Sequence, residues 1–362
     1  MKVLLLGDFS PTSVTDPLFE NGDIEALFSD TVGLFENNDV NFVNLECAVT
    51  DSDSAINKIG PPLKCCKNTV NVLKQIGVNY VGLSNNHIFD YGKTGVYDTL
   101  AHLDRAGIGY TGFGDNYEDS RKDLVIEKDG QSVCIINVCE HEYSYALDDR
   151  MGARPYDEYD TMDDIKNARE KSDRVVVIYH GGKEMCQYPS PRLRKACRAM
   201  VKNGADVVLC QHSHCIGCYE NYNGSHILYG QGNFHFVKDN DDPFDIWNTS
   251  FAVKYDSGAN TVEFVPIVFT KTGITLAKGN VAKMIDDGFC ARNKALETDE
   301  WKKGWSDFCK SVNERYLNAV ANAYAEGCTQ KDKQKFAHYL DCEAHTDVWR
   351  ELFKTYNHKN ER

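Results

Sequence analysis

Five short apolar runs, each followed at once by polar residues, recur along the first two thirds of the chain. They cover residues 3–6, 40–45, 78–83, 174–179 and 205–210. Runs of this length with almost no polar interruption are typical of β-strands that are buried on both faces. They therefore predict a core sheet with helices on its outside.

Helical spacing of apolar residues separates these strands. Residues 69–76 and 96–106 show it, and each stretch is closed by a glycine, Gly77 or Gly107. A third helix is expected over residues 190–203, because Ser-Pro begins it and Gly204 follows it. Alternating strands and helices predict an α/β sandwich.

Three turn signals predict a second, partly antiparallel sheet. Lys128-Asp129-Gly130, Asn223-Gly224 and Asp256-Ser257-Gly258 each divide two β-rich runs. Short Asn-Gly or Asp-Gly connections of this kind favour hairpins.

From about residue 280 the pattern becomes helical, with one stretch near 301–320 and another over 331–356. We expect a C-terminal helical appendage packed on the sandwich. The predicted division is a domain over residues 1–278 and a helical extension over 279–362.

Composition restricts the function. The chain has 362 residues, of which 42% are apolar and 11% aromatic, and its formal net charge is -14. No basic stripe offsets this charge, so nucleic-acid binding is not expected. An anionic substrate would need local positive charge or a metal ion.

Location is predicted from apolar runs and cysteines. No run approaches the about 18 residues of a membrane span, and the apolar start is too short for a signal peptide. Fourteen cysteines without an export signal indicate reduced thiols and a cytoplasmic protein. Cys215 and Cys218 have no second pair, so a packing role is expected instead of a zinc site.

Polar side chains with metal-binding chemistry follow all five predicted strands. They are Asp8, Glu46, Asn85-Asn86-His87, His180, and His212 with His214. Ligands of α/β proteins gather beyond the carboxyl ends of the strands, and carboxylate and imidazole suit divalent metals. The pattern therefore predicts a metal site at this edge.

The ordered set of motifs resembles the calcineurin-like metallophosphoesterases, and within them it is most similar to the CapA family of capsule and poly-γ-glutamate synthesis proteins. The motifs are GD at 7–8, NLE at 44–46, SNNHIFDYG at 84–92, HGGKE at 180–184, GADVVLCQHSH at 204–214 and YGQGNFHF at 229–236. The resemblance covers about residues 1–240. It implies a four-layer αββα fold with two mixed sheets and a dinuclear metal site.

The resemblance also implies a role for each motif residue. Asp8 and His214 would bind one ion, Glu46 would bridge two, and Asn86, His180 and His212 would complete the second. His87 would donate a proton to the leaving group, and Asp90 would orient its ring. One or two Mn, Fe or Zn ions are the expected cofactors.

Two positions depart from the general phosphoesterase pattern. Ser10 stands where the D-x-H motif has a histidine, and Glu46 replaces an aspartate. CapA relatives share both departures. Because a hydroxyl is a poorer ligand than imidazole, the first metal site is expected to be the weaker one.

Four residues are candidates for contact with an anionic substrate. Glu184 and Asn233 lie inside the motifs and either contact substrate, support the ligands or close a turn. Lys64 and Arg192 lie on expected loops, where a solvated surface role is the alternative. Other histidines carry less signal: His226 and His235 are expected to pack, and nothing marks His102 or His345 as chemical.

Three classes of function stay open. The first is a metal-dependent hydrolase, most simply a phosphatase or phosphodiesterase acting on an anionic small molecule or polymer. The second is a part in making or trimming a capsule polymer such as poly-γ-glutamate, alongside other biosynthesis proteins. The third is a non-catalytic assembly subunit. Specificity is expected in the loops 51–66, 140–160 and 183–195.

Overall fold

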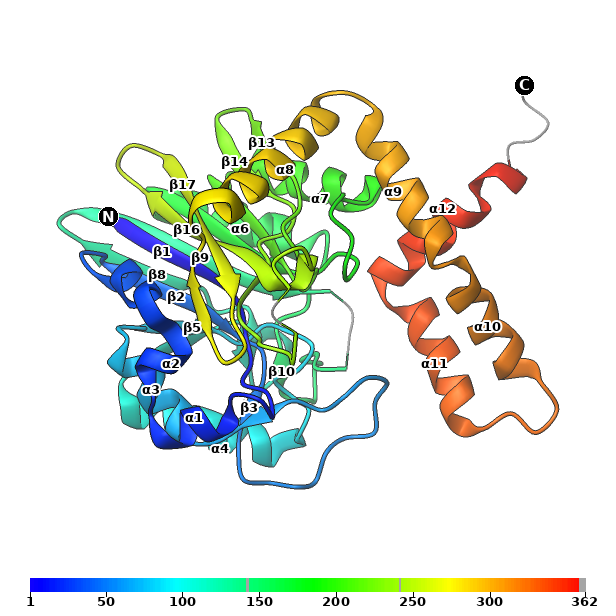
Figure 1. The fold of residues 1–362 in the computed structure, drawn as a ribbon, viewed down its shortest axis with the longest axis horizontal. Helices are drawn as coiled ribbons and strands as arrows, with labels where there is room; N and C mark the ends of the chain where they lie inside the picture. The colour runs from blue at the N-terminus through cyan, green and yellow to red at the C-terminus, as the bar shows by residue number, and fades with distance from the viewer. Residues whose placement is uncertain (141–142, 241, 358–362) are drawn as a thin grey trace.

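Two mixed β-sheets lie face to face between helices in the computed structural model of the chain, which describes residues 1–140, 143–240 and 242–357 (Figure 1). The first sheet has the strand order β18-β17-β16-β1-β2-β5-β6, and β15 also pairs with β1. The second has the order β13-β14-β12-β11-β9-β8. The predicted four-layer αββα architecture is confirmed.

The first sheet consists of β1 (Lys2–Phe9), β2 (Val40–Leu45), β5 (Tyr80–Gly82), β6 (Gly109–Thr111), β15 (Asn233–His235), β16 (Thr249–Asp256), β17 (Thr261–Phe269) and β18 (Ile274–Leu276). The second consists of β8 (Leu124–Lys128), β9 (Gln131–Cys139), β11 (Arg174–His180), β12 (Val207–Gln211), β13 (Tyr219–Tyr222) and β14 (Ser225–Leu228). Two short ribbons pair β3 (Ala48–Val49) with β4 (Lys64–Cys65), and β7 (Phe113–Gly114) with β10 (Gly152–Ala153).

The outer face of the first sheet packs against α1 (Asp16–Asn21), α2 (Ile24–Phe28), α3 (Asn68–Gln75) and α4 (Gly92–Ala106). The outer face of the second packs against α6 (Asp160–Lys171) and α7 (Pro191–Lys202). The remaining helices are α5 (Tyr117–Ser120), η1 (Ser29–Phe35), η2 (Ile246–Asn248), α8 (Gly279–Glu297), α9 (Glu300–Ser311), α10 (Asn313–Tyr324), α11 (Gln330–Asp341) and α12 (Glu343–Asn357).

Side-chain alternation along the strands explains why both faces are apolar. On β1, Val3 and Leu5 lie in the core between the sheets, whereas Leu4 and Leu6 pack toward the helices. Successive side chains of a strand point to opposite faces, so a strand between two cores has no polar face. The predicted doubly buried strands are confirmed.

All three predicted hairpins are present. They join β8 to β9, β13 to β14 and β16 to β17, and each pair is antiparallel. These hairpins add antiparallel strands to otherwise parallel sheets, and both sheets are therefore mixed.

Two buried glutamines fix the sheets relative to each other. Gln211, the last residue of β12, donates from Nε2 to the carbonyl of Leu6 on β1 at 3.1 Å. Gln231 accepts from the same Nε2 at 3.1 Å and donates to the carbonyl of Leu5 at 2.8 Å. Buried amides stabilise a structure only when paired in this way, so they set how the ends of β1 and β12 meet.

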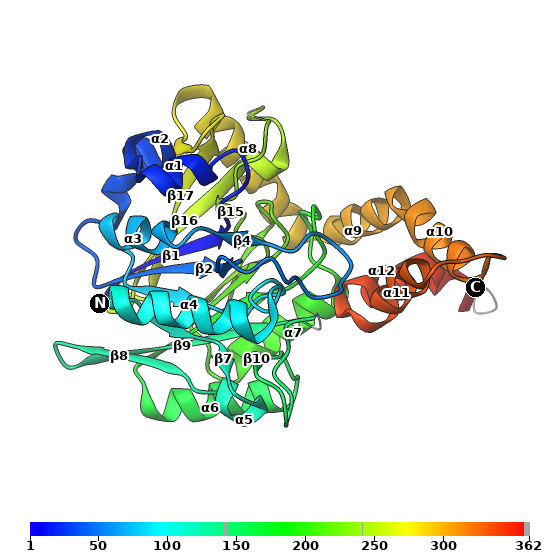
Figure 2. The same cartoon turned by 90° about the horizontal axis from the view of Figure 1, so that it is seen from below.

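The C-terminal helices divide into two parts. Ile285 and Phe289 of α8 pack into the core between the sheets. Helices α9–α12, here called the C-terminal helical layer, lie at one side of the sandwich (Figures 1 and 2) and share an apolar cluster with Cys186 of the loop after β11.

The helical layer contains more helices than the spacing predicts. Each of the two expected stretches is broken once, at Val312 and at Cys342. The breaks let four helices surround one cluster that includes Trp305, Tyr316 and Tyr339. Within the described ranges, no helix combines the length and the apolarity needed to cross a bilayer.

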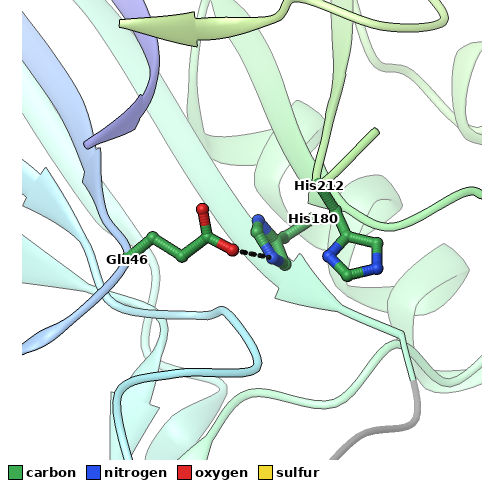
Figure 3. A group of neighbouring side chains, drawn as sticks. All are labelled: Glu46, His180 and His212. Carbon is green, nitrogen blue, oxygen red and sulfur yellow. Dashed lines mark ion pairs between the residues drawn. The ribbon is translucent and has the colours of Figure 1, made fainter. Parts of the chain in front are cut away.

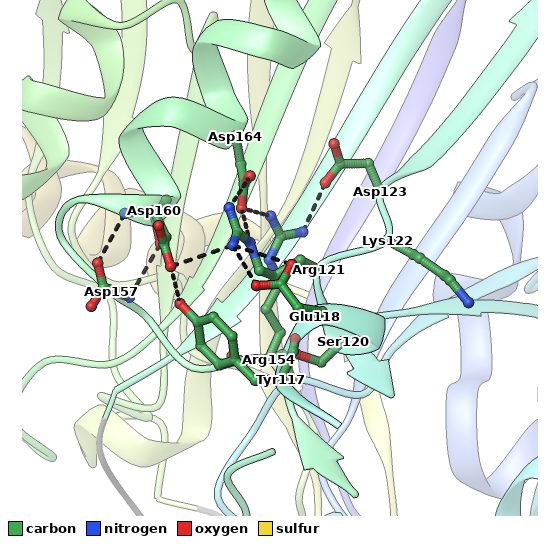
Figure 4. Close-up of polar contacts among 12 residues, drawn as sticks. Tyr117, Glu118, Ser120, Arg121, Lys122, Asp123, Arg154, Asp157, Asp160 and Asp164 are labelled. Carbon is green, nitrogen blue, oxygen red and sulfur yellow. Dashed lines mark hydrogen bonds and ion pairs between the residues drawn. The ribbon is translucent and has the colours of Figure 1, made fainter. Parts of the chain in front are cut away.

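A buried ion-pair network fastens the outer layer beside the second sheet (Figure 4). Arg154 is 1% exposed and contacts Asp123 at 2.8 Å and Asp164 of α6 at 2.7 Å. Arg121 contacts the same Asp164 at 2.8 Å. A buried guanidinium needs such carboxylates, and we assign the network a structural role.

Every cysteine lies in the described ranges, and each of the fourteen is a free thiol. Cys215 and Cys218 are both buried, and the pKa of each thiol is raised to about 12, chiefly by that burial. Neutral buried thiols pack like small apolar side chains.

Gly7 generates the first prediction. A β-carbon at Gly7 would overlap the carbonyl oxygen of Gly232, because β1 and the chain before β15 approach closely there. We expect Gly7→Ala to lower the free energy of unfolding by about 1–3 kcal/mol, since the two backbones must separate. Urea unfolding followed by circular dichroism measures this.

Gly33→Ala is the matched control, because nothing lies within 4 Å of the added β-carbon. Its effect should stay within about 0.5 kcal/mol. Equal stability of the two variants would show that the contact between Gly7 and Gly232 relaxes without cost.

Candidate metal centre

Strand register brings the predicted ligands from both sheets to one edge. On the first sheet, Asp8 of β1 lies beside Asn44 of β2 and Asn233 of β15. Glu46 follows β2 directly. On the second sheet, His180 ends β11 and pairs with the last residue of β12, so the residues that follow β12 lie beside it.

The side chains converge in two overlapping groups. One contains Glu46, His180 and His212, and the other contains Asp8, Glu46 and His214. In each group the ligand atoms lie within 4.8 Å of one another, and all five residues are buried. Figure 3 shows Glu46, His180 and His212 pointing toward one another. Glu46 belongs to both groups, which is the position that a bridging ligand would occupy.

Asn86 joins the first group. Its Oδ1 lies 2.9 Å from His180 Nε2, which in turn lies 3.4 Å from Glu46 Oε1. Ligand atoms about 2.1 Å from one ion are about 3.0 Å apart in an octahedron and about 3.4 Å apart in a tetrahedron. The separations therefore match neighbouring ligands of one cation.

Unpaired polar atoms also fit a cation. Among the described residues, both carboxylate oxygens of Glu46 and Nδ1 of His212 are buried without a hydrogen-bond partner. An ionised carboxylate costs several kcal/mol to bury without compensation. A divalent ion between Glu46 and His212 would supply that compensation.

The two carboxylates shift the neighbouring groups strongly. Burial opposes ionisation of Asp8, yet His180 and His214 hold its pKa well below the usual range. Burial likewise disfavours charged His180, but Glu46 and Asp8 raise its pKa to about 10. Without metal, protons on the imidazoles balance the carboxylates. Metal binding would displace these protons, because a ligating imidazole is neutral.

The loop after β12 holds an unusual backbone. His212 has φ 74° and His214 has φ 53°, both in the left-handed region. Such conformations in residues other than glycine cost about 1 kcal/mol or more and persist where the surroundings enforce them. Here Asp8 Oδ2 accepts from the backbone N–H of His212 at 2.9 Å, which helps to hold the loop.

Asparagines surround the ligands. Asn233 Oδ1 lies 2.7 Å from His214 Nδ1, so Asn233 contacts a ligand directly. Asn44 donates to Asp8 Oδ1 at 2.7 Å and lies 3.1 Å from His180 Nδ1. Asn85 donates to Asn44 Oδ1 at 3.0 Å. Contacts of this type orient ligands. The sequence places Asn85 at this edge, but it does not predict that Asn44 and Asn85 orient the ligands, although both residues lie inside the quoted motifs.

His87 and Asp90 form a pair next to the ligands. His87 Nδ1 lies 2.6 Å from Asp90 Oδ2. Burial opposes ionisation of Asp90, but His87 and Lys58 keep its pKa below the usual value. The ionised carboxylate must accept, so Nδ1 carries the proton and Nε2 is the second ring nitrogen available for chemistry.

Lys58 was not predicted. Its side chain is 3% exposed and contacts Asp90 Oδ1 at 2.5 Å. It lies 3.3 Å from His87 Nδ1, and burial together with this positive charge lowers the pKa of His87. No spacing signal links Lys58 to residues about 30 positions away.

A cavity of about 110 Å³ opens beside this pair. Asn86, His87 and His212 lie on one side of it, and loop residues 58–61 together with Lys183 and Glu184 continue its lining. The C-terminal helical layer supplies the rest, with Arg315, His338, Tyr339, Cys342, Ala344 and His345. Two of the three loops expected to set specificity therefore reach the cavity. His345, which carried no signal in the sequence, reaches it as well.

Lys64 and Arg192 do not line the cavity. Lys64 donates to the carbonyl of Ser52 at 2.7 Å and pairs with Asp53 at 2.8 Å. Arg192 pairs with Glu140 and, at 2.9 Å, with Asp347. The positive charges of Lys64 and Arg192 are therefore paired with nearby carboxylates.

Three further side chains lie away from the cavity. The Ser10 hydroxyl donates to the carbonyl of Pro11 at 3.3 Å. His226 contacts the Tyr219 hydroxyl at 2.7 Å, and His235 lies among the rings of Phe9, Phe19 and Phe28.

Comparison with known proteins gives a family. The family model described as "Bacterial capsule synthesis protein PGA_cap" matches residues 2–238, which is more than half of the chain. The chain is 28% identical over 245 residues to the "PGA biosynthesis protein CapA" of Bacillus subtilis (strain 168), covering 65% of this chain and 63% of that protein. It is also 28% identical over 214 residues to the "Capsule biosynthesis protein CapA" of Bacillus anthracis, covering 57% of this chain and 51% of that protein.

The chain thus spans between about half and two thirds of these relatives. Among solved structures it is similar to a putative 5'-nucleotidase from Staphylococcus aureus in complex with alpha-ketoglutarate, with a TM-score of 0.45 and 13% identity over 79% of this chain and 58% of that one. A likeness this distant carries no argument about function. The match over residues 2–238 shows the family instead: the chain belongs to the bacterial capsule synthesis protein PGA_cap family.

Proposed function

We propose that the chain is a metal-dependent hydrolase that cleaves a phosphoester bond in an anionic substrate. The observation that carries this proposal is the contact of 2.6 Å between His87 and Asp90 beside the buried ligand cluster. Holding a metal needs neither residue, whereas catalysis by proton transfer needs a positioned imidazole.

The proposed ligands are Asp8 and His214 for one ion, Glu46 as the bridge, and Asn86, His180 and His212 for the other. Imidazole with carboxylate suits Mn, Fe or Zn better than Ca. Bound divalent ions would polarise the phosphoryl oxygens and make a hydroxide available at neutral pH.

His87 acts at Nε2 in this proposal. Asp90 accepts the proton of Nδ1 and so keeps the ring in one orientation and one tautomer. Because the pKa of His87 is lowered, chiefly by burial, its resting form is neutral. It must therefore take up a proton at Nε2 before it gives one to the leaving oxygen.

Lys58 supports the pair by contacting Asp90 Oδ1. Its charge offsets that of Asp90, so the buried pair adds no net negative charge beside an anionic substrate. Asn233 orients His214, and Glu184 faces the cavity as a substrate contact.

A second candidate is hydrolysis of a γ-glutamyl amide during capsule polymer synthesis, in company with other biosynthesis proteins. The names of the Bacillus relatives favour this context. The same residues would serve, because amide cleavage also needs a polarised acyl oxygen and a proton for the leaving nitrogen.

The metal proposal predicts a loss of bound ion in His212→Ala. Elemental analysis after loading with Mn or Zn should find about one to two ions per chain in the natural protein and clearly fewer in the variant. His102→Ala is the control, because His102 lies half-buried on α4, outside the ligand cluster. A natural chain that stays metal-free under both loadings would refute the metal site.

The catalytic proposal predicts a different result for His87→Ala and Asp90→Asn. Metal content should stay near that of the natural protein, whereas turnover of a phosphodiester should fall by about 10²- to 10⁴-fold. Initial rates on the metal-loaded proteins measure this, and His102→Ala again serves as control. Full activity in both variants would show that His87 is structural.

A further inference from the structure

The cavity has walls from two distant parts of the chain. Asn86, His87 and His212 come from the sandwich, whereas Arg315, His338 and His345 come from α10, α11 and α12. The family match ends at residue 238, so it does not include the helical side. A group held at the metal centre would therefore face side chains that the family pattern does not describe.

Polar contacts fix the helical side in place. Asp347 of α12 accepts from the Ser190 hydroxyl at 2.5 Å and from Arg192 Nε at 2.9 Å, at the start of α7. On α11, Gln334 donates to the carbonyl of Asn57 at 3.2 Å. These contacts join the C-terminal helical layer to both loops that line the cavity.

Ring packing adds to these contacts. The ring of His338 stacks on Tyr143, with centroids 5.5 Å apart. Tyr339 stacks on His345 with centroids 4.3 Å apart, and the Tyr316 hydroxyl lies 2.6 Å from His345 Nδ1. The wall is therefore a packed surface and its side chains have defined positions.

The charged side chains that line the cavity favour an anion. Lys183 is 7% exposed, and its ion pair with Glu184 is a long one, at 3.4 Å. Arg315 donates from Nε to the Tyr339 hydroxyl at 2.6 Å. Among the described residues, its other guanidinium nitrogens have no carboxylate within ion-pair distance. Lys58 is already balanced by Asp90. Glu184 is thus the one acid in the described lining of the cavity that stands against the charges of Lys183 and Arg315.

The two histidines of the wall add hydrogen-bonding groups instead of charge. Burial, and next the charge of Lys183, lower the pKa of His338 to about 4. The same causes lower the pKa of His345 well below the usual range. Near neutral pH, the positive charge that the described lining of the cavity offers to a ligand therefore comes from Lys183 and Arg315.

We infer that Arg315 and Lys183 form a subsite for a second anionic group of the substrate, a carboxylate or a phosphate, distal to the group held at the metal centre. Arg315 offers the planar donor fork that oxyanions match, and Lys183 offers a point charge in the same cavity. The inference rests on the proposed function, because it takes the reacting group to lie beside Asn86, His87 and His212. It adds that the C-terminal helical layer selects substrates with two anionic ends.

Non-hydrolysable probes test this without relying on turnover. Calorimetry on the metal-loaded full chain compares ω-carboxyalkyl phosphonates, with one to three methylenes, against alkyl phosphonates of the same length that carry no second charged group. A parallel series of α,ω-alkane diphosphonates distinguishes phosphate from carboxylate as the second anion. We expect one spacer length at which the second anion tightens binding by about tenfold or more.

Arg315→Gln should remove most of that advantage while leaving the affinity for the alkyl phosphonate without a second charged group unchanged. Arg350→Gln is the matched control, because Arg350 lies on α12 with 68% of its side chain exposed and does not line the cavity. Arg315→Lys should keep part of the advantage, since it retains the charge without the fork. Thermal unfolding of each variant verifies that the helical layer still folds.

Three outcomes would overturn the inference. The first is that no probe with a second anionic group binds more tightly than its alkyl counterpart. The second is that Arg315→Gln and Arg350→Gln lose this gain in affinity equally. The third is that no phosphonate binds to the metal-loaded protein. Failure of the proposed catalysis would give a different result. If probes with a second anionic group bind with the expected dependence on Arg315 but no phosphoester is cleaved, the subsite is supported and the hydrolase proposal is refuted.

Discussion

Two buried carboxylates, Asp8 and Glu46, impose the constraint on which this structure depends. They lie at the edge where the two sheets meet, where water cannot compensate their charge. The neighbouring groups compensate that charge. They are three imidazoles, a donating asparagine, and a loop whose histidines adopt left-handed backbone conformations. The glutamine pair between β1 and β12 matters for the same reason, because a shift of one sheet would separate Asp8 from the residues that follow β12.

Local charge and total charge differ in sign in this molecule. The chain carries a net charge of -14, yet the described lining of the cavity holds Lys183 and Arg315 against one acid, Glu184, while Lys58 is paired with Asp90. Net charge governs solubility and non-specific association, whereas recognition depends on the few groups within reach of the ligand. An acidic chain can thus offer a site for an acidic ligand.

Much of the fold follows from local pattern, because periodicity and turn chemistry are properties of neighbouring residues. The doubly buried strands and the three hairpins were predictable in this way. The convergence of Asp8, Glu46 and His180 followed from their places at strand ends and from the ordered motifs.

What sequence reasoning missed depends on long-range contacts. Lys58 meets Asp90 through a loop without regular structure, and Arg315 reaches the cavity across more than a hundred residues of intervening chain. The sequence offers Arg192 as an anion contact or a surface residue, and it does not predict the ion pairs with Glu140 and Asp347 that the fold creates. The breaks at Val312 and Cys342 likewise reflect packing around a shared cluster, because neither position carries a proline or a glycine.

The attachment of α12 through Asp347 has a consequence for how this protein can evolve. The residues that anchor the helical layer, Ser190 and Arg192, stand apart from the six side chains that meet at the sheet edge. Substitutions within α10 and α11 can therefore change one wall of the cavity without replacing any of those six side chains. Related chains could therefore differ in ligand preference by exchanging only the segment that forms α9–α12, while the ionisable centre stays the same.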